Sequence, residues 1–190
     1  MSKTLVLMMV DRPADWEYGP LAAAAHAWFG VDVVSASIEG SPLTTMSGLT
    51  LQPQQRLTDL DPLAADLWVV PGSPLWDEAP APEPILAALR ARVAAGRAVA
   101  GICGGTRALA AAGVLDERAH TSNEAGYLSE VAGYRGGAHY REEACVSDGL
   151  VATAPGTSPI SFAQACLRIL LPEQEEGIAQ MRAMFAREFA

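Results

Sequence analysis

The chain has 190 residues, half of them hydrophobic, and a formal net charge of −9. This length and composition suit one domain, residues 1–190, with a sizeable core. The negative charge argues against a nucleic acid or an anionic membrane as a partner held by charge. No apolar run approaches the 18 residues of a transmembrane helix, and the apolar N-terminal stretch is shorter than a typical signal peptide, so it fits a first buried strand better.

Three cysteines, Cys103, Cys145 and Cys166, are widely spaced along the chain. An odd number of cysteines without CxxC spacing points away from a disulfide framework and from a zinc ribbon. A reducing cytoplasm is the simplest location for such a protein. We expect neither a metal nor a cofactor.

Apolar runs alternate with helical segments along most of the chain. The runs predict buried strands at residues 4–10, 31–37, 65–70 and 98–102. Composition and periodicity predict helices at residues 18–29, 84–95, 108–112, 159–171 and 173–189. This alternation predicts an α/β fold, in which helices cover both faces of a parallel sheet.

Smaller elements are expected between these segments. They are a surface hairpin over 41–53, a short strand over 120–122, a short helix over 124–131, and strands over 140–146 and 150–153 joined by a Ser-Asp-Gly turn at 147–149. We expect Pro20 near the start of the first helix and Ser158 as a helix cap. In the last helix, Ile178, Met181, Met184 and Phe185 fall on one packing side.

The stretch around Cys103 is the candidate catalytic motif. A buried strand ends at residue 102, a helix-forming segment follows, and the spacing Gly101-x-Cys103-x-Gly105 between them matches a nucleophile elbow. Such a turn favours strained backbone angles at its central residue and needs small neighbours. It would place Cys103 at the carboxyl edge of the sheet, beside helical N–H groups that favour a thiolate or an oxyanion. The alternative is a buried structural cysteine with glycines for close packing.

Glu17 is the predicted partner of this cysteine. It follows the first strand by a loop and opens the first helix, so it too is expected at the carboxyl edge of the sheet. In an apolar setting its carboxyl group could stay protonated and donate a hydrogen bond to a thiolate. Alternatively, Glu17 is a solvated acidic residue at a helix N-terminus.

Backbone amides are the candidate oxyanion donors. They are the N–H of Gly104 and, from the turn Pro71-Gly72-Ser73 at the end of another strand, the N–H of Ser73. Trp76 lies just beyond this turn and either walls the pocket or packs on the surface. Gly72 and Trp76 complete the expected oxyanion and substrate-binding set.

No histidine stands out as a general base. His26 falls in the first helix and His139 precedes the predicted hairpin. His120 reaches the cysteine only if its short strand turns inward, so it is retained as a possible base. Cys145 and Cys166 are interpreted as packing residues on a strand and a helix.

The chain resembles the ThiJ/PfpI superfamily, within the class I glutamine amidotransferase-like fold. The resemblance rests on the elbow at 100–106, Glu17 within the sequence DWEYG, the turn at 70–74, the stretch 121–123 and the segment 148–157. It implies a flavodoxin-like, doubly wound α/β fold, with Glu17 hydrogen-bonded to Cys103 at the elbow. Members of the superfamily include intracellular proteases or amidases, stress and chaperone-like proteins, deglycases and isocyanide hydratases. They usually form dimers.

Three positions depart from the familiar pattern. Protease-like members have a histidine directly after the cysteine, where this chain has Gly104. Deglycase-like members have a histidine where this chain has Asn123, and many members have a second glycine at the position of Ser73. Neither familiar Cys–His pair is therefore present.

The sequence leads to two main hypotheses on function. The first is a cytoplasmic, homodimeric, amidase-like cysteine hydrolase or lyase that acts on a small molecule, with Cys103 as the nucleophile and Glu17 tuning it. The second is a non-enzymatic redox or stress-response protein in which Cys103 is oxidised to a sulfinate. A scaffold or chaperone-like dimer without activity is a third, weaker alternative.

Overall fold

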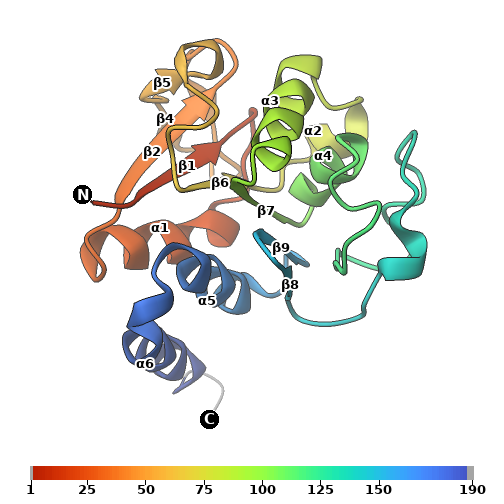
Figure 1. The fold of residues 1–190 in the computed structure, drawn as a ribbon. Coiled ribbons are helices and arrows are strands. Elements are labelled where there is room, and N and C mark those ends of the chain that lie inside the picture. The colour runs from red at the N-terminus through yellow and green to blue at the C-terminus, as the bar shows by residue number, and fades with distance from the viewer. Residues whose placement is uncertain (1, 188–190) are drawn as a thin grey trace.

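A computed structural model describes residues 2–187, which fold around a seven-stranded sheet (Figure 1). In spatial order its strands are β5 (Gln55–Arg56), β2 (Asp32–Ser37), β1 (Thr4–Met8), β6 (Leu67–Val70), β7 (Ala98–Ile102), β9 (Val151–Ala154) and β8 (Val146–Asp148). All neighbouring strands pair in parallel except β8 and β9. The prediction of a mainly parallel sheet is confirmed.

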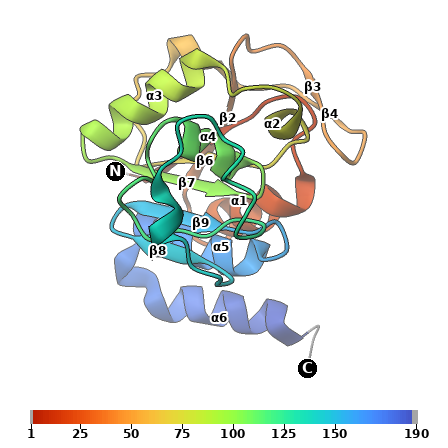
Figure 2. The ribbon, with the colours of Figure 1, turned by 90° about the vertical axis from the view of Figure 1, so that its right-hand side faces the viewer.

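Helices cover both faces of this sheet (Figures 1 and 2). One face carries α1 (Asp15–Ala27) and α5 (Pro159–Leu170), with α6 (Glu175–Ala186) packed outside α5. The other carries α2 (Leu75–Glu78), α3 (Glu83–Ala94) and α4 (Gly105–Ala111). Short 3₁₀ turns lie at Leu57–Asp59, Gly136–His139 and Pro172–Gln174. Within residues 2–187, no helix has the length and hydrophobicity needed to cross a bilayer.

Because helices cover both faces of the sheet, the molecule has two hydrophobic cores, one on each side. Along β1, Leu5 and Leu7 join the core beneath α1 and α5, whereas Val6 and Met8 join the core beneath α3 and α4. Successive side chains of a strand point to opposite faces, so a strand covered on both sides reads as a continuous apolar run. This explains why the central strands were predictable from hydrophobicity alone.

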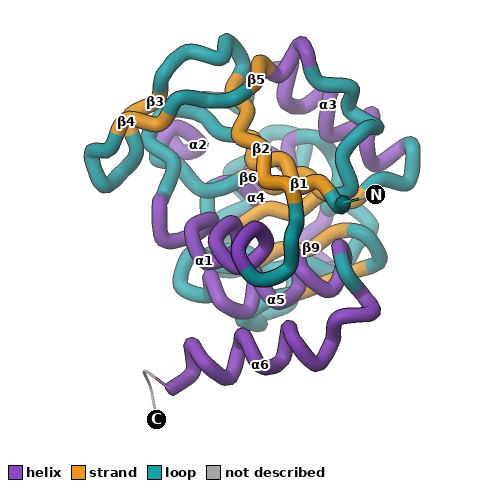
Figure 3. Tube along the Cα trace, turned by 90° about the vertical axis from the view of Figure 1, so that its left-hand side faces the viewer, coloured by secondary structure: helices purple, strands orange, loops and turns teal. Residues whose placement is uncertain are grey.

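The hairpin expected over 41–53 is present as an antiparallel pair, β3 (Leu43–Thr44) and β4 (Thr50–Leu51). It stands beside the start of α1, as Figure 3 shows. The N–H and the hydroxyl of Ser47 donate to the Asp15 carboxylate over 2.9 and 3.0 Å. The hairpin is thereby fastened to the first turn of α1, which carries Glu17.

Several predicted elements differ from the structure. Residues 124–131 form successive turns rather than a helix, and the short strand at 120–122 is reduced to one bridge between His120 and Tyr140. The strand predicted over 140–146 is extended only from Val146, and the hairpin turn lies at 149–150 instead of 147–149. Side chains of this outer region find partners across the sequence, which local patterns do not encode.

Helix ends also differ from the predictions. Helix α1 begins at Asp15, so Pro20 lies inside it rather than near its start. Ser158 occupies the N-cap position of α5, but its side chain makes no capping hydrogen bond. In α6, Ile178 and Met181 are buried as expected, whereas Met184 is exposed. The predicted end of this last helix, residue 189, lies outside the described residues.

The topology gathers four strand ends at one edge. Strands β1, β6, β7 and β9 are parallel neighbours, and the segments that follow them carry Glu17, Gly72, Cys103 and Gly156. The strand order reverses between β1 and β6, because β2 lies on one side of β1 and β6 on the other. Open α/β sheets place their sites at such a reversal, beyond the carboxyl ends of the strands.

Candidate active site

Cys103 occupies a strained turn between β7 and α4. Its φ is +55°, a left-handed conformation that side chains rarely adopt. The turn is held by hydrogen bonds from Cys103 N–H to the Ala154 carbonyl over 2.9 Å and from the Thr106 hydroxyl to the Cys103 carbonyl over 2.6 Å. A Cβ atom on Gly105 would overlap the carbonyl oxygen of Val70. The strain and close packing predicted for a nucleophile elbow are confirmed.

Glu17 lies beside the sulfur and is fully buried. The N–H of Gly72 donates to its Oε2 over 2.6 Å, and its Oε1 has no hydrogen-bond partner of normal geometry among the described residues. A Cβ atom added to Gly156 would lie 3.0 Å from Glu17 Oε1 and 2.9 Å from Cys103 Sγ. The Glu17 carboxyl group and the Cys103 sulfur therefore lie close together, both next to Gly156.

The two acidic groups raise the cost of ionising each other. Burial raises the pKa of Glu17, and its contacts with the Cys103 thiol and the Gly72 N–H offset part of this shift. Burial and the nearby Glu17 carboxylate raise the pKa of Cys103 to about 11. Two acids in contact titrate as a pair, because the second negative charge is disfavoured by the first. Near neutral pH the pair therefore holds at least one proton between oxygen and sulfur, so Cys103 is not a preformed free thiolate.

Asn123 is the site residue missing from the predicted set. Its Nδ2 donates to Cys103 Sγ over 3.3 Å, and its Oδ1 accepts the N–H of Gly156 over 3.0 Å. This contact lowers the pKa of the Cys103 thiol, against the effect of burial. The signal in the sequence was its position, because the resemblance implies a histidine there in deglycase-like members, but Asn123 lies in a turn that no local pattern predicts.

The expected oxyanion donors have different roles. The N–H of Gly104, next to Cys103 in the chain, lowers the pKa of the Cys103 thiol. The N–H of Gly72 is occupied by Glu17, so Gly72 holds the carboxylate rather than an oxyanion. The Ser73 side chain is nearly buried, and its hydroxyl donates to the Asp11 carbonyl over 2.6 Å. The backbone N–H of Ser73 makes no hydrogen bond in the described chain, so it stays a candidate donor.

Trp76 and His120 are both buried, and among the described residues neither donates a hydrogen bond to the Cys103 sulfur. Trp76 packs against the elbow, 3.0 Å from where a Gly104 Cβ would lie, and its indole N–H donates to the Pro71 carbonyl over 2.9 Å. His120 Nδ1 lies 2.7 Å from the Arg118 carbonyl, so it must donate, and Nε2 lies 2.7 Å from the Tyr134 hydroxyl. Both ring nitrogens are engaged, and the structure does not bring His120 to Cys103.

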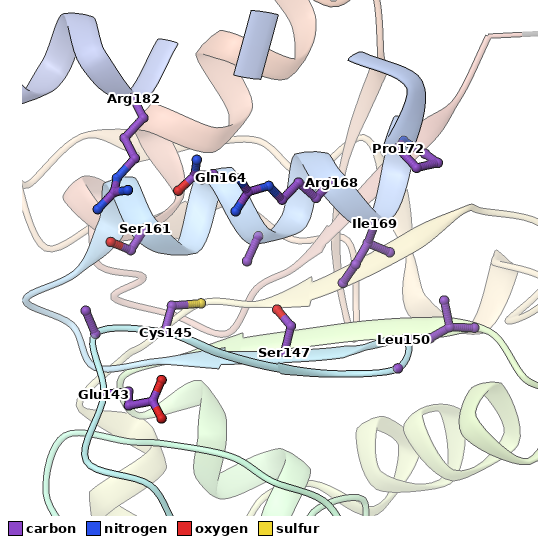
Figure 4. Close-up of a pocket in the computed structure, with 13 residues that line it drawn as sticks. Glu143, Cys145, Ser147, Leu150, Ser161, Gln164, Arg168, Ile169, Pro172 and Arg182 are labelled. Carbon is purple, nitrogen blue, oxygen red and sulfur yellow. The ribbon is translucent and has the colours of Figure 1, made fainter. Parts of the chain in front are cut away.

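A larger cavity, with a volume of about 730 Å³, lies elsewhere, between β8 and α5 (Figure 4). Cys145 lines it, whereas Cys166 is fully buried within α5. A smaller cavity of about 260 Å³ is lined by Asn123, whose side chain contacts Cys103, and by hydroxyl groups that include Ser122 and Thr157.

Comparison with known proteins identifies relatives along most of the chain. Residues 2–169 match the sequence model of the DJ-1/PfpI family. A Bacillus subtilis protein named uncharacterized protease YoaZ is 33% identical over 177 residues, which cover 89% of this chain and 84% of the relative. A second, named uncharacterized protease YdeA, is 27% identical over 184 residues, which cover 97% and 91%.

Solved structures share the fold. The DJ-1 superfamily protein Atu0886 from Agrobacterium tumefaciens has a TM-score of 0.92 and 37% identity, covering 99% of this chain and all of that one. A thiJ/pfpI family protein from Bacillus anthracis has a TM-score of 0.82 and 33% identity, covering 90% and 84%. The resemblance stated from the sequence and the predicted fold are both confirmed.

Proposed function

Because the chain belongs to the DJ-1/PfpI family, we propose that it is an amidase-like cysteine hydrolase or lyase acting on a small molecule. Cys103 is the nucleophile and Glu17 is the group that takes and returns its proton. The observation that carries this proposal is the placement of the buried Glu17 carboxyl group beside a sulfur atom on a strained elbow. A purely structural cysteine would need neither.

The chemistry follows from the proton held by the pair. As Sγ attacks an electrophilic carbonyl carbon, the thiol proton passes to the Glu17 carboxylate, and the carbonyl oxygen gains the negative charge. The N–H groups of Gly104 and Ser73 are the candidate donors to that oxyanion. In a hydrolase, collapse breaks the bond to the leaving group, which takes the proton from Glu17. Water then adds to the thioester: Glu17 takes one proton from the water and passes it to the departing sulfur, so that the acid product leaves and both the thiol and the Glu17 carboxylate are restored.

Small, reactive substrates fit this site better than peptides. Two relatives carry the name of uncharacterized protease, but an unactivated peptide leaving group needs a well-placed proton donor. Glu17 would have to serve both the sulfur and the leaving group, since His120 is engaged elsewhere. An activated amide or an α-oxoaldehyde needs less help from a proton donor than an unactivated peptide bond does.

Turnover of a panel of amides and α-oxoaldehydes tests the proposal, with Cys103→Ala as the variant. We expect at least one substrate to be turned over by the wild type and the rate to fall at least a thousandfold in the variant, because the covalent route is lost. Equal rates in both proteins would overturn the proposal. Cys145→Ala is the matched control, and it should leave turnover unchanged.

A redox role is the second candidate, favoured by the unpartnered Oε1 of Glu17 beside the sulfur. Two equivalents of peroxide would add two oxygens to Cys103 and release two waters, and a protonated Glu17 could donate to the resulting sulfinate. Peroxide titration followed by mass mapping tests this. Stable addition of 32 Da at Cys103, without turnover of any substrate in the panel, would favour the redox role over the enzyme.

We also propose an oligomeric state and a location for the protein. We expect a homodimer, and a reducing cytoplasm, where three free thiols persist.

A further inference from the structure

Asn123 is the one asparagine in the 190 residues, and it stands against the sulfur of Cys103. Its carboxamide bridges two groups, because Nδ2 is 3.3 Å from Cys103 Sγ and Oδ1 is 3.0 Å from the N–H of Gly156. The carbonyl of Gly156 in turn accepts the indole N–H of Trp16 over 3.2 Å. The Asn123 carboxamide thus joins the elbow to the segment after β9, and Trp16 holds Gly156 through its carbonyl group.

The orientation of this amide is fixed by hydrogen-bond polarity. The Gly156 N–H can only donate, so it selects the acceptor Oδ1. The amide NH₂ group, which can only donate, is then left facing sulfur. A sulfur atom accepts best as a thiolate, so this arrangement favours the ionised form of Cys103. The Gly156 backbone also lies close to the sulfur, since a Cβ atom added to Gly156 would be 2.9 Å from Cys103 Sγ.

We propose that Asn123 is a positioning residue that stabilises the Cys103 thiolate as a fixed, non-titrating donor, oriented by the Gly156 backbone. A carboxamide does not ionise, so it supports the thiolate equally at every pH. An imidazole at this place would switch charge between pH 5 and 8. The inference rests on the proposed role of Cys103, but it concerns the ionisation of the thiol, which is measured without any substrate.

Two titratable groups, Glu17 and Tyr127, interact with the Cys103 sulfur and can therefore affect its ionisation. The Glu17 carboxylate on α1 has the largest charge interaction with the Cys103 sulfur. Tyr127, from the turns at 124–131, also interacts electrostatically with Cys103. Burial and the hydrogen bond to Asp77 raise the pKa of Tyr127, so it stays neutral across the physiological range. Asn123 therefore acts on a sulfur whose one titrating partner near neutral pH is Glu17.

A single asparagine makes the test direct. Selective ¹⁵N-asparagine labelling yields one pair of side-chain NH₂ resonances. In the wild type, this pair should be shifted from free-amide values and should move with pH at the same midpoint as the thiolate absorbance. In Cys103→Ala the pH-dependent movement should vanish. Resonances at free-amide positions that do not respond to Cys103→Ala would overturn the proposal.

Alkylation of Cys103 gives a second, independent arm. Asn123→Leu removes the donor and should slow alkylation at pH 8 about tenfold, which corresponds to a midpoint one pH unit higher. Asn123→Asp should slow it further, because a second carboxylate would face the sulfur. The exposed neighbour provides the control, as Glu124→Gln should change the rate less than twofold. Wild-type rates in Asn123→Leu would contradict the role even if turnover assays fail to find a substrate.

Discussion

The three cysteines differ in the environment of their sulfur atoms, and this sets their reactivity. Burial raises the pKa of Cys145 to about 12, against about 11 for Cys103, and Cys166 is fully buried. Cys103 also accepts a hydrogen bond from Asn123, and the Gly104 N–H lowers the pKa of its thiol; neither Cys145 nor Cys166 has such a partner among the described residues. Limited alkylation at pH 8 with peptide mass mapping should therefore label Cys103 first, Cys145 about tenfold more slowly and Cys166 least. Equal labelling of Cys145 would contradict this ranking.

The raised pKa of Glu17 should lower the free energy of unfolding as the pH rises. Its pKa is raised by burial, so the folded state binds its proton more tightly than the unfolded chain does. Stability contributed by the protonated form is then lost between the unfolded pKa and the higher folded pKa. Glu17→Gln removes this titration, and it should be more stable than the wild type at pH 8 but similar near pH 4. Urea unfolding at both pH values checks this, and a constant difference between them would contradict the raised pKa.

At the scale of elements, the joint between β7 and α4 depends on Gly105. A Cβ there would overlap the Val70 carbonyl on the neighbouring strand, so the backbone must move. Gly105→Ala should cost about 2 kcal/mol or more in the free energy of unfolding. The matched control is Gly19→Ala in α1, where no atom lies within 4 Å and the change should stabilise the helix by up to about 1 kcal/mol. Similar effects at both positions would refute the close packing.

Arg92 fastens α3 to the sheet from inside the core. It is fully buried, and its guanidinium donates to the carbonyls of Pro62, Ala65 and Ala98 and lies 4.8 Å above the Trp68 ring. Arg92→Lys keeps the charge but loses the planar fork, so carbonyls are left without donors. We expect a loss of about 2 kcal/mol in unfolding free energy. The control is Arg90→Lys, a substitution at an exposed arginine of the same helix. An equal loss of unfolding free energy in this variant would contradict the stabilising role of the buried Arg92 hydrogen bonds.

For the whole molecule, the family leads us to expect a dimer. Sedimentation velocity at tens of micromolar should give a species of twice the 19.9 kDa chain mass. A single 19.9 kDa species at that concentration would contradict it.

The sequence predicted the inner parts of the molecule better than the outer ones. Strands such as β7 were predictable because burial on both faces makes them uniformly apolar, and the elbow because its strained turn demands glycines. Glu17 was predictable from its place after β1. Asn123 was missed as a site residue, because its partners are 20 and 33 residues away and its segment has no regular structure. Hydrogen bonds of this kind depend on the assembled fold.

The central claim is that Cys103 and Glu17 share a proton, and the pH dependence of Cys103 alkylation tests it most directly. Glu17→Gln removes the carboxylate that opposes ionisation of the sulfur but keeps a side chain able to bond Gly72 N–H. We therefore expect the alkylation midpoint to move to lower pH and the rate at neutral pH to rise, while turnover falls because the amide cannot accept the thiol proton. Identical pH profiles in the wild type and Glu17→Gln would contradict the account.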